Sequence, residues 1–161
     1  MPSATFRSGA VVLLLTIGCD LPRDPEDTLE RARGGVVRVG VAENPPWVRL
    51  AASGASGVEP ALVLEIARDL GARIEWVPGA QSTLLSDLHD RKVDLVIGGL
   101  TDDLPWKTEV AFTRPFFEDT AAEKRHVMAT PPGENAWLLH LDRELHRRRS
   151  RVPALLQTAA R

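Results

Sequence analysis

The chain has one cysteine, Cys19, so no disulfide can form within it. The apolar stretch near its start runs only from Ala10 to Ile17, short of the roughly 20 residues that span a bilayer as a helix. The net charge of -2 shows no excess of one sign and gives no reason to expect nucleic acid as a partner. With 43% hydrophobic residues, the composition is that of a globular protein.

Residue patterns typical of catalytic or metal sites are also absent from the sequence. The four histidines lack the spacing of zinc ligands: His89, His126, His140 and His146. Carboxylates are plentiful, but a neighbouring pair such as Asp102 and Asp103 is explained by local turn and capping chemistry. We therefore expect a protein that is not an enzyme, with no catalytic residues, no metal and no cofactor.

Residues 1–19 have the organisation of a secretory signal. A single cation, Arg7, precedes the short apolar stretch, which ends in a small residue followed by Cys19. This ending resembles a bacterial lipobox, with Thr16 where leucine is preferred, and it predicts cleavage before Cys19 and lipidation of that residue. Asp20 resembles the residue that retains lipoproteins at the inner membrane, so we expect a periplasmic or envelope protein with a lipid anchor. An ordinary cleaved signal is the alternative.

After the signal, about 142 residues are enough for one domain of ordinary size. Residues 20–35 are expected to form a spacer with a short helix that starts near Asp24 and ends at Gly34. Residues 36–149 are expected to form the domain itself, and residues 150–161 a basic C-terminal tail.

Strands and helices alternate along this domain. The periodicities predict strands at residues 36–42, 73–77 and 95–97, helices at 59–70 and around 84–88, and a flexible loop at 50–57. Such alternation implies a parallel sheet flanked by helices. Ligands of these sheets bind beyond the carboxyl ends of the strands, where the turns at residues 45–47 and 98–101 fall.

The order of these motifs resembles the bacterial extracellular solute-binding proteins of family 3, the polar amino-acid-binding type. The resemblance rests on the strand and proline-aromatic turn at residues 36–47, the strand and turn at 94–101, and the Phe-Thr-x-Pro-aromatic sequence at 112–116. It implies an α/β fold of the periplasmic-binding-protein-like type II, with a mostly parallel sheet. It also implies a noncatalytic solute-binding component of an ABC-type transporter.

The resemblance further implies where a solute binds. In this family the first turn offers an aromatic residue that packs on the ligand, and the turn after the third strand holds the ligand's charged ends with backbone and hydroxyl groups. The implied ligand-binding residues are Trp47, Gln81, Gly98, Gly99, Thr101 and Trp106.

Trp106 departs from the family pattern. Amino-acid binders have an arginine at this position, five residues beyond Thr101, and its guanidinium grips the ligand carboxylate with paired hydrogen bonds. An indole cannot replace that fork. Three readings stay open: Lys107 supplies a positive charge, Trp47 and Trp106 form an aromatic wall for a more apolar or cationic ligand, or both tryptophans close the edge of the core.

The sequence contains one of the family's two lobes. After a first part at residues 36–117, the chain runs directly to His126–Ala129, which resembles the strand that returns to the first lobe. A closing amphipathic helix at residues 134–149 completes the second part, residues 126–149. Because a lone lobe leaves much of a small ligand in water, we expect weak binding.

The run Arg147–Arg151 is the one strong charge cluster. Cations are favoured near the C-terminus of a helix, so we expect a solvated face. Contact with anionic lipid is the functional alternative.

The sequence therefore predicts a solute-binding protein, reduced to one lobe, for a small polar or amino-acid-like solute. Its expected partners are this solute, an ABC transporter permease and the membrane through a lipid anchor, with no nucleic acid. One alternative is an envelope interaction or sensory module that docks on a membrane transporter or receptor without binding solute. Another is a decayed gene product.

Overall fold

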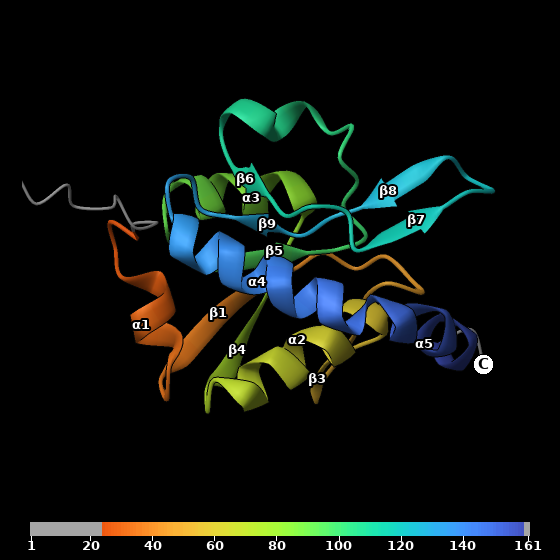
Figure 1. Cartoon of the computed structure of the whole chain (residues 1–161), viewed down its shortest axis with the longest axis horizontal. Helices are drawn as coiled ribbons and strands as arrows, with labels where there is room; N and C mark the ends of the chain where they lie inside the picture. Colours follow the sequence, from red (N-terminus) through yellow and green to blue (C-terminus); the bar gives the residue numbers. More distant parts are fainter. Residues whose placement is uncertain (1–23, 160–161) are drawn as a thin grey trace, which may run out of the picture.

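The computed structural model describes residues 24–159, so the expected signal and Cys19 lie outside the described part of the chain. Its main sheet has the order β4-β1-β5-β9-β6, with the strands Arg73–Pro78, Val36–Val41, Leu95–Ile97, Ala129–Thr130 and Ala111–Phe112. The strands β4, β1 and β5 are parallel, and β9 runs antiparallel to both of its neighbours. The α/β fold with a mostly parallel sheet is confirmed (Figure 1).

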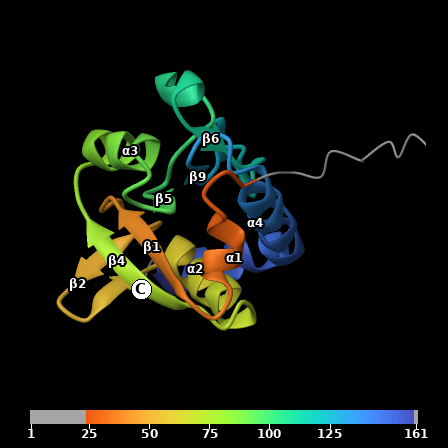
Figure 2. The ribbon, with the colours of Figure 1, turned by 90° about the vertical axis from the view of Figure 1, so that its left-hand side faces the viewer.

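Helices cover both faces of this sheet (Figure 2). The helices α1, α2, α4 and α5 pack with one buried cluster, and their bounds are Thr28–Ala32, Val58–Asp69, Asn135–Arg148 and Val152–Ala159. Helix α3, Gln81–His89, packs with a second cluster on the other face. Because successive strand residues point to opposite faces, Leu95 and Ile97 join the first cluster and Val96 the second. Within residues 24–159, no helix combines the length and apolar character needed to cross a membrane.

The short helix expected in the spacer is packed onto the domain. The Asp24 carboxylate accepts the N–H of Trp137 at 3.0 Å, in the first turn of α4. The Glu134 carboxylate, just before α4, accepts the N–H groups of Glu26 and Thr28 at 3.1 and 3.3 Å. Asp24, before α1, therefore accepts an N–H group at the start of α4, and Glu134, before α4, accepts N–H groups at the start of α1. These N–H groups have no acceptor within their own helix. The folded unit therefore includes residues that we expected to be a spacer.

Two segments expected to be simple connections are hairpins. Residues 50–57, predicted as a flexible loop, contain most of an antiparallel pair, β2 (Arg49–Ala51) and β3 (Gly54–Ser56). The residues between the two parts of the lobe form a second pair, β7 (Phe117–Asp119) and β8 (Lys124–His126). The returning strand expected at residues 126–129 is consequently divided: His126 ends β8, and β9 enters the main sheet at Ala129.

The C-terminal residues expected to be a basic tail continue the fold. After α4 comes a short 3-10 helix, η2 (Arg149–Arg151), and then α5, whose first residue, Val152, is fully buried. Arg148 is not part of a solvated face, because its guanidinium forms ion pairs with Glu65, Asp69 and Glu144. These pairs fasten the end of α4 to α2, so part of the arginine cluster is structural.

Replacing this arginine tests that role. We expect Arg148→Met to lower the free energy of unfolding by about 1 to 2 kcal/mol, because Glu144 keeps only Arg147 as a partner and the pairs with Glu65 and Asp69 on α2 are lost. Arg149→Met, one residue later and exposed, is the matched control, with an expected change below about 0.5 kcal/mol. Urea unfolding followed by tryptophan fluorescence measures both. Equal losses in the two variants would contradict this account.

Candidate functional site at the carboxyl edge of the sheet

The two turns that the sequence predicted to converge lie side by side. Ala42 follows β1 and donates its N–H to the Ile97 carbonyl at 3.0 Å, and the Asn44 side-chain amide donates to the Gly98 carbonyl at 2.9 Å. Gly99 has a φ of +65°, and a Cβ there would lie 2.5 Å from Asn44 Nδ2. The turns therefore touch so closely that only glycine fits at the contact.

A fully buried carboxylate lies beneath the turn after β5. Glu59, the second residue of α2, accepts the N–H groups of Gly98 and Gly99 on one oxygen, Oε2, at 2.7 and 3.0 Å. Burial raises the pKa of Glu59 to about 7, and the two N–H groups oppose that rise. The backbone N–H groups of both glycines thus point to the interior of the protein rather than to a solute.

Trp47 is mostly covered by the protein's own aromatic residues. Its ring stacks on His126 with centroids 3.8 Å apart and also contacts Phe116 and Phe117. Only 8% of Trp47 and 5% of His126 are exposed. Burial lowers the pKa of His126, so at neutral pH the imidazole in this stack is uncharged. The stack therefore forms the floor of the candidate site, and little of the indole is left for a ligand.

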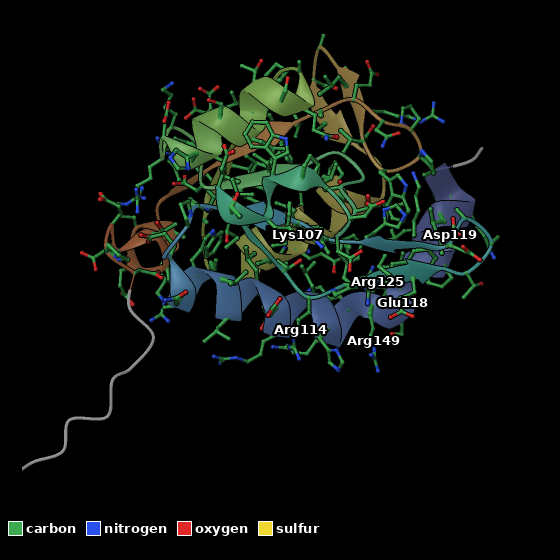
Figure 3. All side chains as sticks on the ribbon, turned by 90° about the horizontal axis from the view of Figure 1, so that it is seen from above. Lys107, Arg114, Glu118, Asp119, Arg125 and Arg149 are labelled. Atoms are coloured by element: carbon green, nitrogen blue, oxygen red, sulfur yellow. The ribbon has the colours of Figure 1, made fainter. Side chains whose placement is uncertain are left out.

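Charged groups of both signs surround this floor. The Thr101 hydroxyl donates to the Asp103 carboxylate, and this bond, helped by the positive charges of Lys124 and Lys107, lowers the pKa of Asp103. Arg125 forms an ion pair with Asp102. In Figure 3 Lys107 and the hairpin residues Glu118, Asp119 and Arg125 lie on the same face of the molecule. Cations and carboxylates are thus both within this rim.

The two remaining predicted residues, Gln81 and Trp106, lie in other elements of the fold. Gln81 is half-buried at the first position of α3, next to the carboxyl end of β4. Trp106 lies in the 3-10 helix η1 (Pro105–Thr108) and packs against the second core cluster, whereas Trp47 belongs to the first. Trp106 is therefore partly covered by the core, and a shared aromatic wall of the two tryptophans stays a prediction.

Three residues of this region were missed as site residues: Asn44, Glu59 and His126. Glu59 stands at the start of a predicted helix, two residues after Gly57, and nothing in its sequence context shows that it reaches a turn 39 residues later. His126 was recognised only as part of a returning strand. Among residues 24–159, no group of three or more His, Cys, Asp and Glu side chains is placed to hold a metal ion.

Residues 37–149 match the family described as bacterial extracellular solute-binding proteins, family 3, and the chain belongs to this family. A curated relative, the membrane-bound lytic murein transglycosylase F of Vibrio cholerae, is 34% identical over 103 residues, which cover 63% of this chain and 19% of the relative. The chain thus spans about a fifth of the length of the curated relatives that it matches.

Solved structures have the same fold. The arginine-bound form of domain 1 from TmArgBP, the arginine-binding protein of T. maritima, superposes with a TM-score of 0.66 and 26% identity, over 73% of this chain and 97% of that domain. An amino acid ABC transporter substrate-binding protein from Streptococcus pneumoniae, bound to L-arginine, gives a TM-score of 0.71 at 12% identity, over 83% of this chain and 97% of that one. The single-lobe reading agrees with the first match, since that structure is itself one domain.

The contact between the two turns can be tested at Gly99. Gly99→Ala combines an unfavourable positive φ with a Cβ placed 2.5 Å from Asn44 Nδ2 and 2.7 Å from Trp47 Cδ1. Gly34→Ala is a matched control, because Gly34 has a φ of +67° but nothing within 4 Å of its added Cβ. We expect both variants to lose about 1 kcal/mol for the backbone conformation. Gly99→Ala should lose about 1 to 3 kcal/mol more for the overpacking.

Thermal or urea unfolding of the two variants gives this difference directly. If Gly34→Ala and Gly99→Ala are equally stable, the turns do not press against each other as described.

Proposed function

We propose that this protein binds a small polar or amino-acid-like solute at the carboxyl edge of its single sheet. The observation that carries this proposal is the convergence of the turns at residues 44–47 and 98–101 in a lobe of a solute-binding family. Gln81 lies at this edge, next to the carboxyl end of β4, and the Thr101 hydroxyl, which donates to Asp103, can still accept a hydrogen bond. The stack of Trp47 and His126 supplies an apolar floor.

The charges of the rim suit a ligand that carries both signs. Lys107 and Lys124 lie close enough to Asp103 to lower its pKa, and Asp119 and Lys124 act on the pKa of His126, so charges of both signs lie near the stack. A zwitterionic amino acid can place its carboxylate near a lysine and its ammonium near an aspartate. No arginine fork stands at position 106, and point charges on flexible lysines hold a carboxylate less rigidly.

A single lobe is compatible with this role. The arginine-bound form of domain 1 from TmArgBP is a related lobe that holds its ligand without a second domain. Much of the ligand surface stays in water in such an open site, so the affinity of this chain should be modest unless another protein covers the solute. We also propose an ABC transporter permease as the partner and an envelope location with a lipid anchor at Cys19, on the basis of the family and of residues 1–19.

A thermal-shift screen tests solute binding. L-arginine, other amino acids, amines and small organic acids are added to the purified protein, and a solute at 100 times its Kd should stabilise the folded state by about 2.7 kcal/mol. Trp47→Ala is a poor probe because the ring lies in the core. Thr101→Val should abolish the shift, and Thr158→Val on α5 should keep it. A cooperative melt that no solute changes would refute the proposal.

The curated relative favours a second candidate. In lytic murein transglycosylase F a lobe like this one belongs to a much longer protein named for another activity. A lobe that is part of a longer protein could serve as a sensory or docking module for an envelope protein and need not bind a solute itself. Failure of every solute in the screen, together with copurification with a membrane protein, would favour this function.

A further inference from the structure

Glu59 connects three segments that meet at the candidate site. Its carboxylate holds the N–H groups of Gly98 and Gly99, and its own N–H donates to the Trp47 carbonyl at 3.2 Å. The preceding N–H, of Val58, donates to the Pro46 carbonyl at 3.4 Å. One residue at the start of α2 therefore fixes the turn after β1 and the turn after β5 relative to each other.

The Glu59 carboxylate is asymmetrically bonded. Oε2 accepts two backbone N–H groups, whereas Oε1 is buried without a hydrogen-bond partner among the described residues. Both N–H bonds are charge-assisted while the carboxylate is ionised, and a neutral carboxylic acid would accept them more weakly. A proton would occupy Oε1 at no loss of an existing bond. The protonation state of Glu59 thus controls the strength of the bonds that hold the glycine turn.

No charged neighbour fixes the protonation state of Glu59. The shift of its pKa to about 7 comes from burial, opposed by the two glycine N–H groups, with no contribution from another charge. The charged and titratable groups on the surrounding elements are engaged elsewhere. Glu43 faces the Leu50 N–H, Glu65 on α2 pairs with Arg148 and Arg151, and His126 stacks on Trp47 with its charge suppressed by burial.

We propose that Glu59 is a proton-responsive positioning residue of the solute turn: ionised, it holds Gly98 and Gly99 in the binding geometry, and protonated, it lets the turn relax. This inference rests on the proposed function for its effect on a solute, but the response of the turn itself does not. The turn carries Thr101, three residues after Gly98, so relaxation moves a group that we place in contact with the solute. Solute affinity should then be higher above neutral pH than below it.

Ionisation of Glu59 is expected to raise solute affinity but to lower the stability of the folded protein. The ordinary pKa of a glutamate, 4.5, rises to about 7 in the folded protein, so the unfolded chain loses its proton first. The contribution of Glu59 to stability is therefore fully present below about pH 4.5 and is lost as the pH rises through 7. Burial of the ionised carboxylate thus costs stability while it orders the binding turn, which is the usual relation at a functional site.

The direct test is the amide NMR signals of Gly98 and Gly99 followed from about pH 5.5 to about pH 8.5. In the unmodified protein both signals should titrate together with a midpoint near 7 and move downfield as Glu59 ionises. Glu59→Gln should remove this titration, and Glu75→Gln, an exposed glutamate on β4, should leave it unchanged. Signals that do not move in the unmodified protein would overturn the inference, even if Glu59→Gln fails to fold.

The second test uses L-arginine, or the best solute of the screen, as the probe. Its Kd should rise as the pH falls below the midpoint, by at most about tenfold per pH unit for one proton, and Glu59→Gln should flatten this dependence. A solute that binds without any pH response of the glycine amides, or more tightly at low pH, refutes the role of Glu59. Titrating amides with no solute binding refute the proposed function and leave the proton response of the turn standing.

Discussion

The closure of the lobe depends on the way the chain leaves the sheet and returns to it. The hairpin of β7 and β8 reverses the chain within a few residues, so β9 can enter between β5 and β6. Thr113 closes the return by donating its N–H to the Met128 carbonyl at 2.9 Å, while its hydroxyl accepts the Met128 N–H at 3.0 Å. The register of the hairpin places Glu118 opposite Arg125 and Asp119 opposite Lys124. Opposite charges across a strand pair favour this register, and a short loop keeps the entropy of closure small.

The same closure shapes the candidate site. It brings His126 onto Trp47, so an aromatic floor forms from two segments that are 79 residues apart in the chain. It also brings the charges of the hairpin to the rim formed by residues 101–107. The β7–β8 hairpin, which connects the two parts of the lobe, therefore contributes residues to the surroundings of the candidate site. In the function that we propose, an open site of this kind would leave part of the solute in water, which limits affinity.

The main sheet could be predicted because its pattern is local. Apolar patterns at β1, β4 and β5, with the helices α2 and α3 between successive strands, leave few arrangements other than parallel strands. The convergence of the Trp47 and Gly99 turns followed from that topology. The hairpins and α5 could not be predicted in the same way. Short polar strands such as β7 and β8 gain their stability from cross-strand pairing, and α5 gains its stability from packing against α2. Neither signal lies in a local stretch of sequence.

The sequence alone determined the fold class, which follows from apolar periodicity, and it identified the family through the resemblance of its ordered motifs. It also predicted the edge of the sheet at which we propose a solute site. Only the tertiary structure decided what each polar group does there. In the folded protein the glycine N–H groups donate to the buried Glu59 carboxylate, and His126 stacks on Trp47. Trp106 packs against the second core cluster. The physical reason is that hydrogen bonds and ring contacts depend on ångström distances between residues far apart in the chain, and the pKa of Glu59 depends on its complete removal from water.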